Sequence, residues 1–474
     1  MDLQGSGGSD ERFSRYVEGL ASVIGHADRV NPLRDYCTGL MMASGRKSVE
    51  PMAAVTAPAR TSAQHQSLLH FVGQASWSDE KVLAKVCEMV LPAMERHGTI
   101  EAWIIDDTGF PKKGKHSVGV ARQYCGQLGK QDNCQAAVSL SIANRAASLP
   151  VRYRLYLPQE WAADAARRRK ARVPEEIVFQ TKPEIALDQL RWACKAGLPR
   201  GVVLLDAGYG NNTELRTQIG ALGLSYAAGI LSSTSLWPPD TQPLPPKRRP
   251  DRGRPPTRPR RSAKHKPVSA KELAFALPRR AWRTIGWREG SHERLTSRFA
   301  RVRVRAAHRN QPRGEEWLLI EWPKGETEPT KYWLSTLPED IIFERLVDLA
   351  KLRWRIERDY QELKQELGLG HFEGRGWPGF HHHATLCIAA YGFLISETET
   401  IPPSAPRAGA RLAKLELPAD YRPRGAADPN RTSHSKLDRD HATAPDLRSR
   451  QKHSAMPLLR AKKRSTQNSQ LVTQ

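Results

Sequence analysis

The sequence predicts an α/β protein in which a mixed sheet is flanked by helices, with a helical N-terminal domain and a β-rich insertion. Strand-like and helix-like segments alternate between residues 99 and 230, which is typical of a sheet with helices packed on it. Before residue 95, apolar residues recur at spacings of three and four, as in amphipathic helices. Strand-like patterning returns between residues 270 and 338.

These patterns divide the chain into four regions. Ser78 followed by Asp79 and Glu80 has the composition of a helix start and supports a helical N-terminal region. Beyond residue 398 periodicity is lost and Pro, Arg and Ser dominate, so we expect a disordered basic tail. The regions are a helical domain, an α/β core in two parts, an insertion and the tail: 1–95, 96–232 with 339–397, 233–338 and 398–474.

Short apolar or alternating runs predict the strands, and longer runs with helical periodicity predict the helices. The predicted core strands are 100–105, 136–143, 151–157, 202–205 and 224–230, and the predicted insertion strands are 299–304, 316–322 and 331–337. The predicted helices after the N-terminal region are 183–196, 213–222, 341–367 (with room for one break) and 377–395.

The charge of the chain indicates a polyanionic partner. Its 474 residues carry a formal net charge of +24, which favours nucleic acid, with an anionic membrane surface as the weaker alternative. Residues 243–268 are proline-rich and densely basic, so they lie along DNA phosphates or serve as a solubilising linker. No apolar run approaches the length of a membrane helix, and the N-terminus lacks a signal-peptide core. We therefore expect a cytoplasmic, nucleoid-associated protein without a membrane partner.

Six cysteines are scattered along the chain and none forms a CxxC pair. This spacing argues against a zinc site and against a disulfide framework. We expect free, mostly buried thiols.

Three acidic motifs have the character of a divalent-metal site. Asp106 and Asp107 follow one apolar run, Asp206 follows another, and Glu357 lies in a helix-like stretch. Carboxylate oxygens are the ligands that Mg²⁺ prefers, and adjacent carboxylates repel each other unless a cation lies between them. Asp107 and Asp206 are 99 positions apart, and Asp206 and Glu357 are 151 apart, so the second gap requires an intervening unit.

The motifs resemble those of the DDE-superfamily transposases of bacterial insertion sequences. Arg353, Glu357 and Lys364 have the spacing of the tyrosine–arginine–glutamate–lysine signature found in some of these families. The tyrosine of that signature would fall at Ala350, where this chain departs from it. The resemblance covers residues of about 60 to 395, and the block from Asp106 to Tyr124 is its most specific part.

The resemblance implies a ribonuclease-H-like core split by an insertion, in which Asp107, Asp206 and Glu357 are the catalytic and metal-binding residues. Because the family's first aspartate directly precedes a threonine, Asp107 is favoured, with Asp106 as the rival. The cofactor would be two Mg²⁺ ions, with Mn²⁺ as a possible substitute. The implied reaction is cleavage at the ends of an insertion sequence and joining of the 3′-OH to target DNA. The implied partners are double-stranded DNA (terminal inverted repeats and target) and a second copy of the chain.

Basic residues near the acidic motifs are candidates for DNA binding. Arg353 and Lys364 share a helix face with Glu357, so we expect them to hold phosphate; a solvated ion pair with Glu357 is the alternative. Lys112, Lys113 and Lys115 predict a phosphate-facing loop, with surface solvation as the alternative. The consecutive residues 381–383 are histidines, but they would face different directions on a helix, so we interpret them as a helix start rather than a metal cluster.

Two other functions fit the same motifs. One is a ribonuclease-H-like nuclease that cuts DNA without joining it. The other is a DNA-binding remnant whose core is catalytically inert, which the missing signature tyrosine and the unusual tail keep open.

Overall fold

The computed structural model describes residues 8–42, 45–241, 243–246, 260–262, 265–289, 294–307 and 313–400. Residues 247–259 of the basic stretch and residues 401–474 of the tail lie outside the described residues, as do the predictions made for them. None of the helices in the described part of the chain combines the length and apolar character that a membrane crossing requires.

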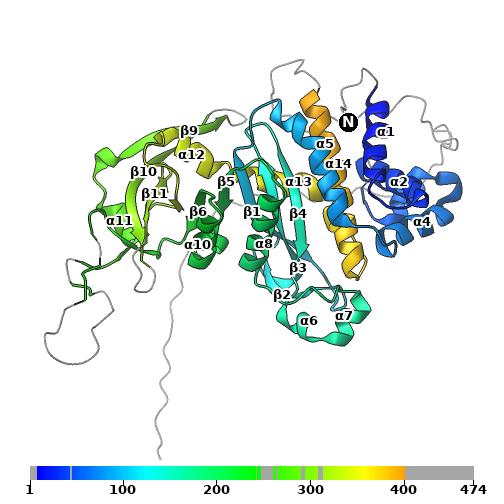
Figure 1. Ribbon diagram of the computed structural model, residues 1–474, viewed down its shortest axis with the longest axis horizontal. Helices are drawn as coiled ribbons and strands as arrows, with labels where there is room; N and C mark the ends of the chain where they lie inside the picture. Colours follow the sequence, from blue (N-terminus) through cyan, green and yellow to red (C-terminus); the bar gives the residue numbers. More distant parts are fainter. Residues whose placement is uncertain are drawn as a thin grey trace, which may run out of the picture. The chain divides into compact units, whose positions relative to one another are not determined.

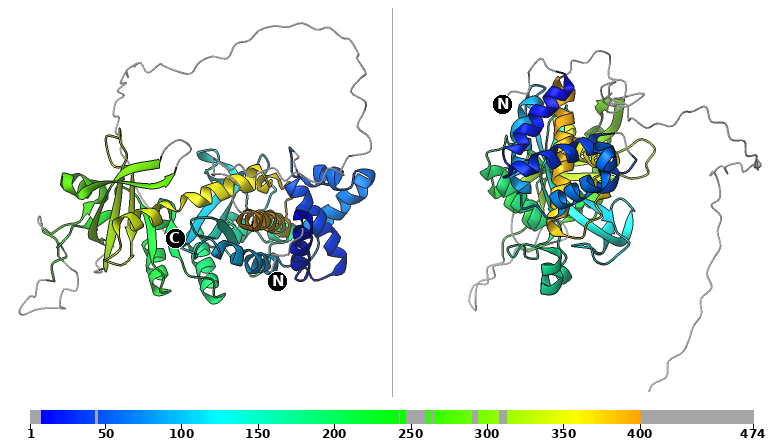
Figure 2. Two further views of the ribbon diagram at one scale, coloured as in Figure 1. Left: turned by 90° about the horizontal axis from the view of Figure 1, so that it is seen from above. Right: turned by 90° about the vertical axis from the view of Figure 1, so that its right-hand side faces the viewer.

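The N-terminal region is helical, as predicted. Helix α5 begins where expected, with the Ser78 side chain accepting a hydrogen bond from the Lys81 backbone N–H at 3.2 Å. The five helices lie on one side of helix α14 (Trp377–Thr400), which also packs on β4 (Ser148–Leu155), and share an apolar core with it (Figure 1, Figure 2). Their bounds are α1 Ser9–Ala21, α2 Val30–Met41, α3 Val49–Thr56, α4 Thr61–Gly73 and α5 Asp79–Glu95.

The strands of the described residues form one mixed sheet flanked by helices, which confirms the predicted fold class. Its order is β2-β3-β1-β5-β6-β12-β11-β10-β7-β8, with β4 paired to β3 and β9 paired to β10. Strands β1, β5 and β6 are parallel to one another, and β1 is antiparallel to β3. The core strands are β1 Ala102–Pro111, β2 Ala121–Cys125, β3 Lys130–Ala143, β4 Ser148–Leu155, β5 Val202–Leu205 and β6 Tyr226–Ile230.

The β-rich segment before the last acidic motif continues this sheet. Strand β12 pairs antiparallel with β6, so the strands of the insertion are added to the edge of the core (Figure 1). A short helix, α11 (Ala270–Ala276), precedes the long hairpins. The strands are β7 Ser235–Trp237, β8 Val268–Ser269, β9 Trp282–Glu289, β10 Arg294–Ala306, β11 Glu315–Trp322 and β12 Lys331–Ser335.

Helices lie on both faces of the sheet, and the buried apolar side chains form two cores. One core joins α8 (Lys182–Lys195) and α10 (Thr213–Ala221) to the face that carries Trp103 and Ile105. The other joins α12 (Phe343–Lys351) and α13 (Trp354–Gln365) to the opposite face, which carries Ala102 and Ile104. Alternation of side chains along β1 therefore decides which set of helices each residue meets. Helix α14 lies against β4 and α13, where Phe380 stacks on Tyr153 and Tyr391 donates to Asp359. The remaining helices are α6 Gln159–Ala163, α7 Ala165–Ala171 and α9 Ala207–Gly210.

The long helix predicted over 341–367 is broken once, between α12 and α13. Strand β1 is longer than predicted: it continues through Asp106 and Asp107 to Pro111 instead of ending at residue 105. The extension is paired with β3 throughout, from Asp106 opposite Ser139 to Pro111 opposite Cys134. The polar residues Asp106 and Asp107 predict a strand end, whereas pairing with the long strand β3 keeps the backbone extended through them.

The cysteines are free thiols, as predicted. Five of the six are buried, and Cys194 is partly buried. Trp103 of β1 is completely buried.

Candidate carboxylate site

Strand register brings Asp106 beside Asp206. In the parallel pair of β1 and β5, Ala102 is opposite Val202 and Ile104 is opposite Leu204. Two residues further along each chain, the same register reaches Asp106 and Asp206. Both positions continue the face that carries Ile104 and Leu204, which pack in the core shared with α12 and α13.

Asp107 points to the other face of the sheet. Its neighbours Ile105 and Trp103 pack in the core that contains α8, and its carboxylate forms an ion pair with Lys182, the first residue of α8. The side chain of Asp107 is 24% exposed. Lys182 was not among the residues singled out in the sequence; the only signal for it is its position directly after the helix cap Thr181.

Asp206 lies at the end of β5 and starts the short helix α9. Its Oδ1 atom accepts a hydrogen bond from the Tyr209 backbone N–H at 3.1 Å, which fixes the carboxylate at this turn. Gly210 after it is needed for close packing, because a Cβ atom there would lie 2.0 Å from the carbonyl oxygen of Gly229 on β6. The DAGYG sequence therefore serves backbone packing as well as any approach of a substrate.

Arg353 connects the first and third acidic motifs. Its Nη1 atom donates to Asp106 Oδ2 at 2.6 Å, and its Nη2 atom donates to Glu357 Oε1 at 2.9 Å. Glu357 is one helical turn along α13 from Arg353, and its side chain is 66% exposed. Helix α13 thus lies over the face of the sheet that carries Asp106 and Asp206. The guanidinium of Arg353, at the start of this helix, lies between the carboxylates of Asp106 and Glu357.

Burial changes the chemistry of Asp106. Loss of water raises its pKa to about 6; the nearby Arg353 guanidinium opposes this rise, and the charge of Asp206 adds to it. The two aspartates are therefore close enough to repel each other, and Arg353 supplies the nearest opposing charge.

The donor set fits a hard cation, although no ready-made metal cluster is present. Among the described residues, no three His, Cys, Asp or Glu side chains lie close enough together to hold a metal ion. Asp106, Asp206 and Glu357 offer only oxygen atoms, as Mg²⁺ requires. Arg353 lies where positive charge is needed, so binding of a cation between Asp106 and Glu357 would require its guanidinium to move.

Comparison with known proteins identifies the family of the chain. Residues 19–294, more than half of the chain, match the family model described as "DDE superfamily endonuclease". The chain belongs to the DDE superfamily of endonucleases. The matched part of this DDE-family chain includes Asp106, Asp107 and Asp206 but ends before Glu357, which lies on α13.

A curated relative supports the same family. Over 169 residues the chain is 31% identical to the "Probable transposase for insertion sequence element IS701" of Microchaete diplosiphon. The matched segment makes up 35% of this chain and 41% of the relative.

Lys364 and Lys112, two of the cations predicted to bind phosphate, are partly engaged by the protein. Lys364 Nζ donates to the carbonyl of Gly109 at 2.8 Å, three positions beyond Asp106, and burial lowers its pKa to about 8. Lys112 Nζ donates to the carbonyl of Phe372 at 2.9 Å, and burial lowers its pKa as well. Lys113 and Lys115 are exposed. Their binding to phosphate remains a prediction.

Helix α13 is fixed by two buried polar contacts that the sequence did not indicate. The Tyr360 hydroxyl is 2.7 Å from Ser139 Oγ on β3, directly opposite Asp106 in the strand pair. Asp359 is completely buried, and its Oδ1 atom accepts from Ser148 at 2.5 Å and from Tyr391 at 3.0 Å. Ala350, at the position of the signature tyrosine, is buried in the apolar core.

The three consecutive histidines have structural contacts. His381 accepts a hydrogen bond from the Leu155 backbone N–H. The two ring nitrogens of His382 lie 3.0 Å from the carbonyl oxygens of Val72 and Trp77. His383 forms a hydrogen bond with the Tyr36 hydroxyl. All three are buried and point to different neighbours, as expected for a helix rather than a metal site.

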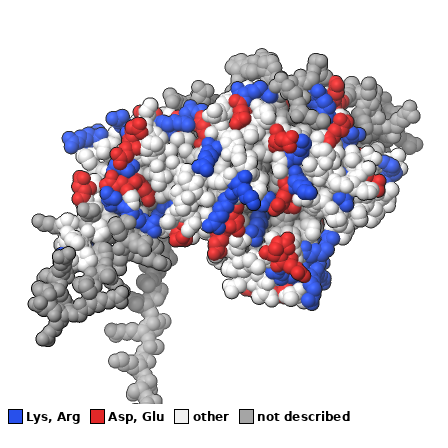
Figure 3. Space-filling model, viewed as in Figure 1, with Lys and Arg blue, Asp and Glu red and all other residues white. Residues whose placement is uncertain are grey.

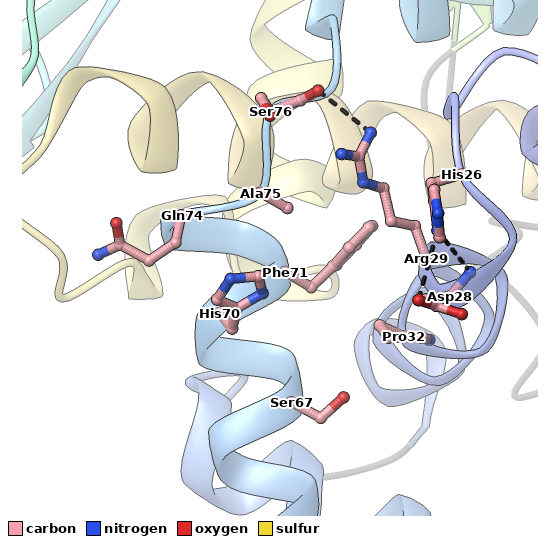
Figure 4. A pocket seen from close by; sticks show the side chains of 10 residues that line it. All are labelled: His26, Asp28, Arg29, Pro32, Ser67, His70, Phe71, Gln74, Ala75 and Ser76. Carbon is pink, nitrogen blue, oxygen red and sulfur yellow. Dashed lines mark hydrogen bonds and ion pairs between the residues drawn. The ribbon is translucent and has the colours of Figure 1, made fainter.

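The described surface carries both signs of charge. On the face shown in Figure 3, lysines and arginines are interspersed with acidic residues. A surface pocket of about 520 Å³ lies in the helical region, between α2 and α4, where Arg29 Nη1 donates to the Ser76 carbonyl at 3.1 Å (Figure 4). Its lining comes only from residues 26–76 and includes none of the acidic motifs.

Proposed function

We propose that this DDE-family endonuclease is a DNA transposase that cuts the ends of an insertion sequence and joins the resulting 3′-OH to target DNA. The observation that carries the proposal is the common face of Asp106, Asp206 and helix α13, on which Arg353 links Asp106 to Glu357. The partial relative, which is named as a probable insertion-sequence transposase, supports DNA as the substrate.

We propose Asp106, Asp206 and Glu357 as the carboxylates of the site, with Asp106 in place of Asp107. The reason is geometric: Asp107 is on the opposite face of β1 and is paired with Lys182. These oxygens would hold Mg²⁺, or Mn²⁺ in its place, which when bound supplies Lewis acidity to the phosphodiester and to water.

The side chains of the chain itself would bind and orient the DNA strand. Arg353 can exchange its carboxylates for a phosphate, since a guanidinium binds either anion with the same fork of donors. Lys364, which lies beyond Glu357 on α13 and contacts β1, would neutralise the next phosphate. Lys112, Lys113 and Lys115 would extend this basic path. A second copy of the chain would be required to bring two DNA ends together.

The test uses a DNA fragment that carries the sequences flanking this gene on both sides. Wild-type protein with Mg²⁺ should release cut ends and form joined products in a second duplex, whereas Asp206→Asn should form neither. Cut ends without joined products would instead support a nuclease that does not transfer strands. Absence of cleavage by the wild type would support an inert DNA-binding protein.

A further inference from the structure

The turn between β2 and β3 presents two large apolar side chains to solvent. Tyr124 is 61% exposed and Leu128 is 41% exposed. Single exposed apolar residues are common on protein surfaces, so exposure alone does not indicate a function. Here both belong to one hairpin tip, which consists of the end of β2, Gly126 to Gly129, and the start of β3.

The hairpin is fixed beside the carboxylate site. Cys125 packs directly on β1: a Cβ atom at Gly109 would lie 2.9 Å from Cys125 Sγ. Lys364 Nζ lies 2.8 Å from the Gly109 carbonyl and 3.4 Å from Gln127 Oε1 at the tip. Gly109 follows Asp106 by three residues, so the hairpin meets the β1 backbone about 10 Å along the strand from Asp106, at about 3.3 Å per residue.

The surroundings of the tip are basic. Arg122 is two residues before Tyr124 on β2, so both side chains project from the same face of the hairpin, and both are exposed. Lys113 and Lys115 lie on the neighbouring loop, which Asn133 of β3 holds by donating to the carbonyls of Lys112 and Gly114. Lys113 and Lys115 form no ion pair with any other described residue, and Arg122 lies close enough to Asp132 to interact with it electrostatically. The acidic side chain here, Asp132, is paired with Lys130 at 3.2 Å.

We propose that Tyr124 and Leu128 form a wedge that enters the DNA duplex and unstacks a base next to the phosphodiester to be cut. This inference rests on the proposed function and adds to it a pair of residues that position the substrate. Exposed apolar side chains flanked by exposed cations are chemically complementary to a DNA duplex, since the cations bind the phosphates while the apolar groups contact the stacked bases.

The contact of the hairpin with β1 sets the scale on which the wedge would meet DNA. Successive phosphates of one strand are about 3.4 Å apart along the axis, so the distance of about 10 Å along β1 from Asp106 to Gly109 corresponds to about three base pairs. The Asp106 side chain is only 13% exposed, so a phosphate has to enter a recessed site to reach it. Unstacking the neighbouring base would free the strand to bend inward, and an aromatic ring can replace the lost stacking partner.

The first experiment detects unstacking without cleavage. The Asp206→Asn protein is mixed with the flanking-sequence duplex that carries the fluorescent base 2-aminopurine at one position at a time around the cut. We expect fluorescence to rise at a position within about three base pairs of the cut. Adding Tyr124→Ala and Leu128→Ala should abolish the rise while anisotropy shows an affinity within about threefold, because the phosphate contacts remain.

The second experiment measures cleavage in an otherwise wild-type protein. The double substitution should slow cleavage of the paired duplex by about tenfold or more, and two mismatched base pairs at the responsive position should restore the rate. Tyr124→Phe keeps the aromatic ring and should behave as wild type. Phe275→Ala removes an equally exposed apolar side chain, 51% exposed on α11, and should have no effect.

The outcomes separate the wedge from the proposed function. Cleavage by the double variant at the wild-type rate, or cleavage by the wild type without a fluorescence change in the Asp206→Asn complex, overturns the wedge alone. A fluorescence change that depends on Tyr124 and Leu128, in a protein that never cleaves DNA, supports the wedge and overturns the proposed function. No binding to the duplex overturns both.

Discussion

Arg353 donates to the Asp106 carboxylate at 2.6 Å, and this contact fixes helix α13 over the face of the sheet that carries the candidate site. The two residues are 247 positions apart in the chain. The same guanidinium holds Glu357, so one side chain links the first and third acidic motifs. Arg353 supplies the positive charge that opposes the rise in the pKa of Asp106 caused by burial and by the charge of Asp206.

Removal of Arg353 should destabilise the protein through Asp106. Arg353→Ala leaves a recessed carboxylate without its partner, and we expect the free energy of unfolding at pH 7 to fall by about 1–3 kcal/mol. The measurement is urea denaturation in a double-mutant cycle with Asp106→Asn. The loss caused by Arg353→Ala should be smaller in the Asp106→Asn background, and equal losses in both backgrounds would show that the pair does not interact.

Buried Asp359 should make stability depend on pH. Burial raises its pKa to about 7, well above the value near 4 of an unfolded chain, although Ser148 and Tyr391 donate to it. Between these values the folded state binds the extra proton, so the contribution of Asp359 to stability falls as pH rises from about 4 to about 7.

Asp359→Asn removes the titration and keeps the acceptor for Ser148 and Tyr391. The free energy of unfolding of this variant, relative to that of wild type, should therefore increase as pH rises from 5 to 7.5. The measurement is urea denaturation at each pH. A difference between the two proteins that stays constant over this range would contradict the assignment.

Lys364 should contribute to DNA affinity only while it is protonated. Burial lowers its pKa to about 8, so its charge is lost as pH rises through that value. Lys364→Met should reduce the slope of log affinity against log salt by about 0.9 at pH 7, the value for one phosphate contact, and by less at pH 9. Binding is measured by anisotropy, with Lys195→Met at the far end of α8 as the control. An unchanged slope at pH 7 would remove Lys364 from the DNA path.

His382 should stabilise the contact between α14 and the helical region. Its ring lies within 3.0 Å of two carbonyl oxygens and stacks on Trp77 with 3.7 Å between ring centroids. His382→Ala should lower the free energy of unfolding by about 1–3 kcal/mol, because the ring packing and the buried carbonyls both lose a partner. The exposed His70→Ala is the matched control. Equal denaturation midpoints for the two variants would show that the His382 contacts contribute nothing.

The sequence was most informative where local pattern and burial coincide. The strand over 202–205 was predicted with its observed bounds, because its four apolar residues are enclosed by α/β packing and end at Asp206. The helix predicted over 341–367 allowed for one break without placing it, and the structure has one between α12 and α13. Helical spacing correctly placed Arg353 within reach of Glu357, one turn away.

What could not be predicted depends on pairing between distant segments. The face on which Asp106 lies follows from the extension of β1 along β3, since a strand that ended at residue 105 would leave both aspartates in a loop. The contacts of Tyr360 with Ser139 and of Asp359 with Ser148 join residues more than 200 positions apart, and no local periodicity carries that information. The addition of the insertion strands to the core sheet depends likewise on the pairing of β12 with β6.

The most direct test compares Mg²⁺-dependent cleavage by Asp106→Asn and Asp107→Asn on the flanking-sequence duplex, with Asp206→Asn as the inactive reference. If Asp106, Asp206 and Glu357 form the site, Asp106→Asn should lose activity by about a thousandfold, like the reference, while Asp107→Asn should stay within about tenfold of wild type. Urea denaturation confirms that each variant is folded. Loss of cleavage in Asp107→Asn with activity preserved in Asp106→Asn would contradict the account.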